Sequence, residues 1–199
     1  MLDALIIGAG PAGLTCLLYL TLYKLNALCV GDVIGGKVLF APHIVDFPGI
    51  EGISGKEYIA HLLTQLENLK VQPTVDEIRN AHPGQENTFA IELASGKQYS
   101  AKSLVIASGN GNKQKENRGL KLANQLGLAT ERGFIKTQTQ STTHVKGVFA
   151  AGDCMLYPIS LEQLTTSVST GITAAAAAYE YISKSKPPII WGKSRIQRM

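Results

Sequence analysis

The pattern of apolar and polar positions at the start of the chain predicts a strand, a helix and a second strand. Residues 4–7 form a short apolar run, and residues 27–30 form another. The stretch between them is expected to be helical to about Tyr23. Short apolar runs joined by a helix are typical of parallel strands that are covered on both faces. The first thirty residues therefore predict the opening βαβ unit of an α/β fold.

Further along, the pattern predicts two more helices and several short strands. The helices are expected over residues 54–69 and from about Ser160 to Ile182, the second beginning with a capping box formed by Ser160 and Gln163. Between residues 71 and 99 the segments TVDEI, TFAIEL and KQYSA predict a small antiparallel meander. Further strands are expected at Leu104–Ala107, in ERGFIKT and at Val148–Ala151.

The basic excess of the chain belongs to its C-terminal end. The 199 residues include 19 basic and 15 acidic side chains, a formal charge of +4. Five of the basic residues and none of the acidic ones lie from Lys184 onward, so the preceding chain is nearly neutral. A nucleic-acid-binding face needs basic residues clustered on the folded body, and this function class is disfavoured. We expect one domain over residues 1–183 and a basic tail over 184–199.

The apolar beginning of the chain is not typical of a signal peptide. Asp3 stands where a signal peptide is basic, and no apolar run approaches the ~18 residues that cross a bilayer. Cys16, Cys29 and Cys154 are too few and too scattered for a disulfide framework, so we expect a cytoplasmic protein. The four histidines have no metal-ligand spacing, and no metal site is predicted.

A glycine motif, GAGPAG, lies between the first predicted strand and its helix. Gly8, Gly10 and Gly13 have G-x-G-x-x-G spacing, with Pro11 and Ala12 inside the motif. The first glycine permits a tight turn, the second lets the backbone approach a pyrophosphate, and the third allows close helix packing. The motif predicts dinucleotide binding but does not separate FAD from NAD. A different nucleotide or a vacant turn of the same shape is the alternative.

A second motif, TTHVKGVFAAGD at residues 142–153, narrows the choice. Its apolar strand ends in Gly152 and Asp153, where a carboxylate is able to meet the ribityl hydroxyls of a flavin, which NAD lacks. A generic strand and turn with Asp153 as a cap is the alternative. Asp32 is a candidate for the ribose, although it lies slightly late after the second strand for that role. The two motifs together predict FAD.

Residues 142–153 resemble the second FAD fingerprint of the pyridine nucleotide-disulfide oxidoreductases, in particular the thioredoxin reductase branch. The likeness extends to about residue 183, because residues 35–49 resemble the segment that passes the flavin ring and residues 103–109 resemble the strand ending in A-T-G. It implies a Rossmann-like FAD-binding domain of three layers, with a parallel sheet and an antiparallel meander, that forms a homodimer. The further FAD contacts that it implies are Gly35, Gly36, Ser108, Gly109 and the backbone amides of Gln163 and Leu164. A capped surface helix is the alternative for the last two.

The departures from this family concern the redox partners. The relatives insert a nicotinamide-binding domain with its own glycine motif after the A-T-G strand, whereas here Gly109 leads through a short polar link to GLKLANQLGL. The CxxC motif is absent as well. We expect a flavin oxidoreductase without a nicotinamide domain between about residues 110 and 120, using an external donor or acceptor. A non-enzymatic FAD-binding sensor and one part of a split reductase complex are the alternatives.

Three residues are candidates for the chemistry itself. Lys37 and Asp46 stand where thioredoxin reductases commonly have Gln and Asn, and a pair between them would tune the flavin potential or relay a proton. Cys154 is the one thiol that we consider reactive. The alternatives are a solvent-exposed turn for Asp46 and passive packing for Cys154. Glu162 stands where relatives often have a basic or aromatic residue, and it is equally well interpreted as an acid at a helix N-terminus.

The tail contains an apolar cluster, Ile189, Ile190 and Trp191, after two prolines. Similarity to ferredoxin–NADP reductases of the same branch suggests Trp191 as an aromatic cover for the flavin. Packing of the cluster on its own domain, a dimer interface and a membrane or partner contact are the alternatives.

Overall fold

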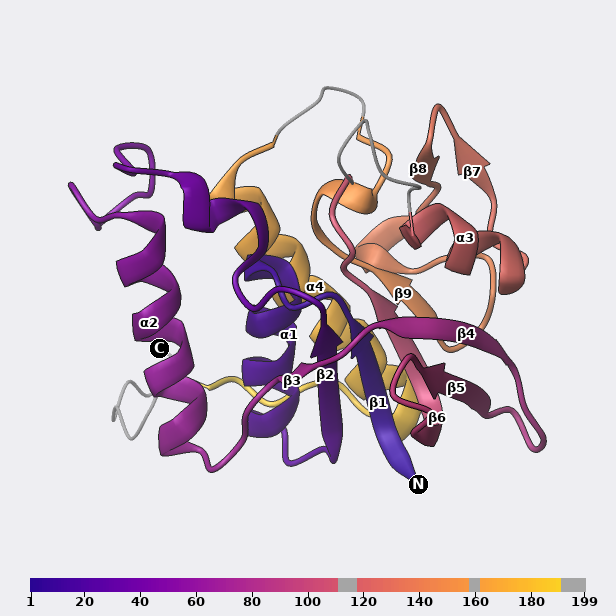
Figure 1. Ribbon diagram of the computed structural model, residues 1–199. Helices are drawn as coiled ribbons and strands as arrows, with labels where there is room; N and C mark the ends of the chain where they lie inside the picture. Colours follow the sequence, from indigo (N-terminus) through magenta and orange to yellow (C-terminus); the bar gives the residue numbers. More distant parts are fainter. Residues whose placement is uncertain (111–117, 158–161, 191–199) are drawn as a thin grey trace.

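The computed structural model describes residues 1–110, 118–157 and 162–190, and it places a mixed, mostly parallel sheet between two layers (Figure 1). The expected Rossmann-like α/β class is confirmed. The helices are α1 (Pro11–Leu22), α2 (Gly55–Asn68), α3 (Arg118–Gln125) and α4 (Leu164–Ser183). The strands are β1 (Leu2–Ile7), β2 (Ala27–Gly31), β3 (Thr74–Val75), β4 (Ile78–Pro83), β5 (Phe89–Leu93), β6 (Gln98–Ile106), β7 (Thr130–Glu131), β8 (Phe134–Ile135) and β9 (Val148–Ala150).

The main sheet has the strand order β3-β2-β1-β6-β5-β4, and β9 pairs with β6. Strand β1 pairs in parallel with both β2 and β6, as the opening βαβ unit requires. On its other side β6 is shared, because residues 98–101 pair with antiparallel β5 and residues 104–106 pair with parallel β9. One long strand thus connects the meander to the parallel sheet. The C-terminal ends of β1, β6 and β9 meet at one edge of the sheet.

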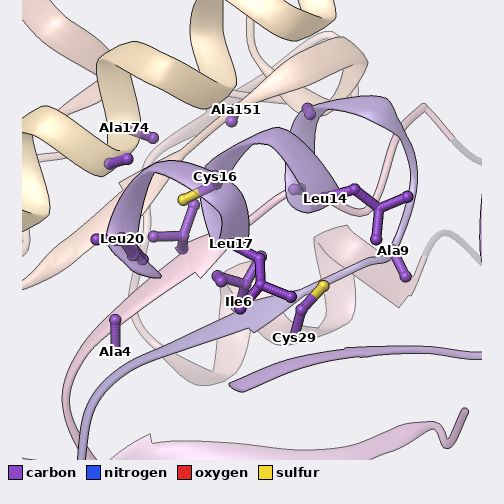
Figure 2. Packing of buried hydrophobic residues seen from close by; sticks show 14 of the residues in the cluster. Ala4, Ile6, Ala9, Leu14, Cys16, Leu17, Leu20, Cys29, Ala151 and Ala174 are labelled. Atoms are coloured by element: carbon purple, nitrogen blue, oxygen red, sulfur yellow. The ribbon is translucent and has the colours of Figure 1, made fainter. Parts of the chain in front are cut away.

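Alternate residues of β1 enter two different hydrophobic clusters. Ala4 and Ile6 pack with α1, α2 and α4, whereas Leu5 and Ile7 pack with the meander and α3. Figure 2 shows the first cluster, in which Leu14, Leu17 and Leu20 of α1 pack beside β1. The predicted continuous apolar run of β1 is explained by this burial on both faces.

Several predicted boundaries were wrong. TVDEI is not one meander strand, because β3 pairs in parallel with β2 at the sheet edge and β4 begins only at Ile78. KQYSA and the following apolar strand form the single strand β6. ERGFIKT is not one strand, because Arg132 and Gly133 both have positive φ and form the turn between β7 and β8. In each case the pairing partner, rather than the local pattern, decided where the strand ends.

The described part of the tail begins far from the glycine motifs. Helix α4 has 20 residues and so extends about 30 Å, ending at Ser183. After it, Ile190 is half-buried against the cluster of α1, α2 and α4, while Ile189 is 63% exposed. Ile190 therefore packs on its own domain, one of the alternatives given for the tail. Trp191 lies outside the described residues.

Candidate functional site

The glycine motif forms the turn between β1 and α1, and two of its glycines are required by packing. Gly8 has φ +108°, and a Cβ there would lie 2.3 Å from the Ala107 carbonyl oxygen at the end of β6. A Cβ on Gly13 would lie 1.8 Å from the Gly8 carbonyl oxygen. No side chain fits at such distances from backbone, so these glycines let α1 and β6 approach the turn closely.

Gly10 is different, because nothing within the described protein requires a glycine there. Its φ of −79° and ψ of −175° are extended values that any residue adopts. A Cβ on Gly10 would have no contact within 4 Å among the described residues outside its chain neighbours. Helix α1 follows with Pro11 in its first turn and no side-chain cap. The open side of Gly10 and the uncapped amides of α1 together leave room and donors for an anionic ligand.

The second motif, which follows β9, lies directly against the first. Gly152 has φ +71°, and a Cβ on it would lie 2.9 Å from the Ala12 Cβ. The Gly152 amide donates a hydrogen bond of 2.9 Å to the Thr170 hydroxyl on α4. A Cβ on Gly171 would lie 2.4 Å from the Ala12 carbonyl oxygen, so α4 crosses α1 at very short range. The two motifs, distant in sequence, therefore form one continuous surface.

A third segment joins them from the end of β2. The Gly35 amide donates to the Ala9 carbonyl at 2.7 Å, and a Cβ on Gly36 would lie 3.3 Å from the Gly10 Cα. Asp32 is exposed and comes directly after β2, beside the first turn. The structure thus brings Asp32, Gly35 and Gly36 to the same edge of the sheet as Gly10.

Asp153 is half-buried at the second turn, and its environment disfavours the charged carboxylate. Burial raises the pKa of Asp153 above its ordinary 3.8, and the nearby Glu162 carboxylate raises it further. Lys37 and a hydrogen bond with Ser167 oppose this shift without cancelling it. A carboxylate that is kept in a position unfavourable to its own charge is typical of a binding or catalytic site.

We expect D153N to stabilise the cofactor-free protein at pH 7. Because the folded protein holds the Asp153 proton more tightly than the unfolded chain, the group increasingly opposes folding as the pH rises above 3.8, and does so fully above its raised pKa. The Asn side chain removes this effect and still accepts a hydrogen bond from Ser167. Urea unfolding at a series of pH values should show a gain at pH 7 that disappears below the ordinary pKa of 3.8. A variant less stable than wild type at pH 7 would contradict the burial argument.

Ser108 and Gly109 lie at the end of β6, next to both turns. The Ser108 hydroxyl is buried and has no hydrogen-bond partner among the described residues. Gly109 has φ +68°, and a Cβ on it would meet no described atom within 4 Å outside its chain neighbours. A buried hydroxyl without a partner is unusual in a native protein, and a ligand would satisfy it.

Cys154 does not have the properties of a reactive thiol. Its Sγ donates to the Ile106 and Ala151 carbonyls, each at 3.2 Å, and burial raises its pKa to about 11. The nearby Ser108 hydroxyl lowers the pKa of Cys154 slightly, without offsetting the effect of burial. The burial and hydrogen bonds of this thiol therefore favour passive packing, the alternative given for Cys154 above.

We expect none of the three cysteines to react with 5,5′-dithiobis(2-nitrobenzoate) in the folded protein at pH 8. Cys16, Cys29 and Cys154 are all buried and unpaired. Burial raises the pKa of Cys29 to about 12 and that of Cys16 well above its ordinary value. All three should react after unfolding in guanidinium. Rapid labelling of one thiol in the native protein would restore it as a catalytic candidate.

Lys37 and Asp46 are not brought together. Asp46 is exposed in the loop of residues 41–53, and among the described residues no ion pair joins it to Lys37. The Lys37 ammonium instead donates to the Asn110 side chain, whose amide donates to Glu162 at 2.6 Å. Nothing in the sequence marks Asn110, Ser167 and Thr170 as parts of this site, since a lone polar residue in a link or helix gives no signal of its own.

Helix α4 begins at Leu164, later than predicted. Gln163 is the N-cap residue and makes no side-chain capping bond, so it is not the third residue of a helix capped at position 160. The predicted capping box is therefore wrong, and Ser160 itself lies outside the described residues. Leu164 packs against the cluster of α1 and α2. The first turn of α4 nevertheless lies beside the second motif, because the Gly152 Cβ position is 3.9 Å from the Ser167 hydroxyl.

The described residues contain neither a candidate metal centre nor a helix suited to crossing a membrane. No group of three or more His, Cys, Asp or Glu side chains is arranged to hold a metal ion in residues 1–110, 118–157 and 162–190. None of the helices described for this chain has the length and apolar character needed to cross a membrane.

Comparison with known proteins agrees with this geometry. The thioredoxin reductase of Listeria monocytogenes serovar 1/2a is 31% identical over 108 residues, which are 54% of this chain and 33% of that protein. The ferredoxin–NADP reductase of Ligilactobacillus salivarius is 31% identical over 156 residues, 75% of this chain and 45% of that protein. The chain thus spans a third to a half of the length of these relatives.

Solved structures match the fold over most of the chain. The atypical thioredoxin reductase TRi from Desulfovibrio vulgaris Hildenborough has a TM-score of 0.82 and 19% identity, covering 94% of this chain and 100% of that chain. The ferredoxin-flavin thioredoxin reductase from Clostridium acetobutylicum has a TM-score of 0.80 and 20% identity, covering 92% and 98%. The family profile described as pyridine nucleotide-disulphide oxidoreductase matches residues 2–121 and 54–180. The chain therefore belongs to the pyridine nucleotide-disulphide oxidoreductase family.

Proposed function

We propose that this chain binds FAD along the surface formed by its two glycine turns and acts as a flavin oxidoreductase. The observation that carries the proposal is the contact of Gly152 with Ala12 beside a Gly10 whose side is open. A dinucleotide extended over this surface would have its pyrophosphate at Gly10 and its ribityl chain toward Asp153. Family membership supports the same cofactor.

The residues present fit such a ligand. The uncapped amides of α1 are available to phosphate oxygens. The exposed Asp32 carboxylate after β2 is available to accept hydrogen bonds from ribose hydroxyls. The buried Ser108 hydroxyl, which has no hydrogen-bond partner within residues 1–110, 118–157 and 162–190, gives the site a polar group for a ligand to bind. The proposed binding residues are Gly8, Gly10, Pro11, Ala12, Gly13, Asp32, Gly35, Gly36, Lys37, Asp46, Ser108, Gly109, Gly152, Asp153, Gln163 and Leu164.

Each part of the chain has a separate task in this proposal. FAD, when bound, supplies the redox chemistry of its isoalloxazine. The first turn and α1 hold the phosphate charge, Asp153 accepts hydrogen bonds from ligand hydroxyls, and the first turn of α4 directs its amides toward the same surface. Lys37 provides positive charge beside Gly36. The D153N variant, which gains stability without cofactor, should lose affinity for FAD.

The electron partners are external in this proposal. Relatives of the chain are named as thioredoxin and ferredoxin–NADP reductases. Between the end of β6 at Ile106 and the start of α3 at Arg118, the chain leaves no room for a nicotinamide domain with a glycine motif of its own. The CxxC thiol pair is absent from the sequence, and Cys154 is buried. We further propose that the protein is cytoplasmic and forms a homodimer. Light scattering of the purified protein measures its molar mass and so tests the dimer.

The test is the visible spectrum of the purified protein, followed by anaerobic reduction. We expect the absorption bands of bound flavin, either as purified or after addition of FAD. NADPH, NADH, reduced ferredoxin and a dithiol are then compared in parallel, and ferredoxin or another protein donor should bleach the flavin faster than either nicotinamide. A protein that neither contains nor takes up FAD would refute the function. Rapid stoichiometric bleaching by NADPH would refute the external-donor part alone, and bound flavin that no donor reduces would favour a non-enzymatic FAD-binding subunit.

A further inference from the structure

A side-chain bridge joins three segments of the chain at the edge of the sheet that carries the glycine turns. Asn110 lies just beyond β6, and its Oδ1 accepts a hydrogen bond from the Lys37 ammonium, 73 positions earlier. Its Nδ2 donates to Glu162 Oε1, 52 positions later, at 2.6 Å. One amide thus connects the Lys37 ammonium with the Glu162 carboxylate.

The chemistry of the bridge requires an amide at position 110. An ammonium group donates only and a carboxylate accepts only, so the residue between them must accept on one side and donate on the other. Asn does both, and the two charges fix which end faces which partner. A carboxylate at position 110 would keep Lys37 but repel Glu162, and an apolar side chain would lose both bonds.

The two ends of the bridge lie on the flanks of the two turns. Lys37 follows Gly36, whose Cβ position is 3.3 Å from the Gly10 Cα in the first turn. Glu162 lies two residues before α4 and close enough to Asp153 in the second turn to raise its pKa. Lys37 acts on Asp153 with the opposite sign. The bridge therefore connects the segment that leaves the first turn with the segment that precedes α4.

The bridge contributes little to the fold itself. Both hydrogen bonds are solvent-exposed, and polar contacts of this kind add little to folding stability. The effect of ordering these side chains is instead local, because it restrains a lysine and a glutamate that would otherwise sample many rotamers beside the turns.

We propose that Asn110 is a positioning residue of the cofactor site, holding Lys37 and Glu162 so that the two segments stay joined while FAD is bound. The inference rests on the proposed FAD binding. Asn110 fixes the Lys37 charge beside the phosphate-facing turn and keeps Glu162 directed away from the ligand. Its expected effect is on the rate at which FAD leaves the protein, rather than on whether the protein folds.

The test measures FAD dissociation rates for wild type, N110L, N110D, E162Q and the double variant N110D/E162Q. N110L and N110D should release FAD about fivefold faster, because each breaks at least one bond to a charged partner. E162Q should release FAD at most about twofold faster, since its amide oxygen still accepts from Asn110 but the negative charge that strengthens this bond is lost. The double variant should return to within about twofold of wild type, because the new amide donates to the new carboxylate while the carboxylate still accepts from Lys37.

Two controls distinguish the effect of breaking the bridge from a general charge effect and from a folding defect. N68D makes the same charge change at the exposed C-terminal end of α2 and should leave FAD release unchanged. Denaturant unfolding of all cofactor-free variants should remain close to wild type, which excludes a fold defect. If wild type binds FAD but N110L releases it at the wild-type rate, or the double variant fails to recover, the bridge has no role in binding. If wild type does not bind FAD at all, the proposed function fails instead.

Discussion

Replacing Gly10 with valine should abolish FAD binding and leave the cofactor-free protein folded. The backbone at Gly10 is extended, and a Cβ there meets nothing within 4 Å among the described residues beyond its chain neighbours. The valine side chain would instead occupy the side from which a pyrophosphate approaches the backbone. We expect the dissociation constant for FAD to rise at least about a hundredfold in a fluorescence titration, equivalent to about 2.7 kcal/mol.

The matched control for this prediction is G13A. The Gly13 Cβ position lies 1.8 Å from the Gly8 carbonyl oxygen, so a single methyl group forces the turn and α1 apart. G13A should therefore lower the stability of the cofactor-free protein, measured by urea unfolding, where the larger G10V change does not. If G10V binds FAD as wild type does, the open side of Gly10 is not the ligand site.

Valine at Gly171 should strongly destabilise the protein and separate the two turns. The Gly171 Cβ position is 2.4 Å from the Ala12 carbonyl oxygen and 3.1 Å from the Thr15 Cβ, where α4 crosses α1. Because backbone cannot move aside as a flexible side chain does, the helices must separate, and we expect a loss of about 3 kcal/mol in the free energy of unfolding. The displacement of α4 also moves Thr170, which accepts the hydrogen bond from the Gly152 amide. FAD affinity should fall together with stability.

The control for G171V is S169V on the same helix. Ser169 is exposed, so S169V introduces the same β-branched side chain into the helix without a packing conflict. Urea unfolding should show a change within about 0.5 kcal/mol for S169V. Equal losses for the two variants would show that helix propensity, and not the α1–α4 contact, limits stability.

Much of the fold was predictable because the strands of the parallel core are buried on both faces. Residues 4–7, 27–30 and 148–151 are short apolar runs for this reason, and the structure places β1, β2 and β9 there within a few residues. The strands of the meander were harder, since β3 and β4 lie within one polar stretch and belong to different neighbours. The chain carries no local signal that distinguishes pairing with β2 from pairing with β5.

In the candidate site, too, some residues were predictable from local sequence and others depended on contacts between distant segments. Glycine spacing alone marked Gly8, Gly10 and Gly13; the positive φ of Gly8 and the close packing at Gly8 and Gly13 require glycine, whereas Gly10 leaves an open side. Lys37 and Asp46 were expected to pair from their places in a resemblance, but Lys37 is bonded to Asn110 and Asp46 is exposed. Long polar side chains on a surface reach several partners, and only their positions in space decide among them.

By itself, the amino-acid sequence determined the order of the parallel strands' apolar segments, the two glycine turns and the carboxylate that follows the second one. These are local properties, recorded in residue type and short spacing. Only the tertiary structure decided that Gly152 lies on Ala12, that Gly171 admits α4 against α1, and that Asn110 connects Lys37 with Glu162. Those contacts join residues far apart in the chain, and packing in three dimensions selects them because no short-range pattern encodes which distant surfaces meet.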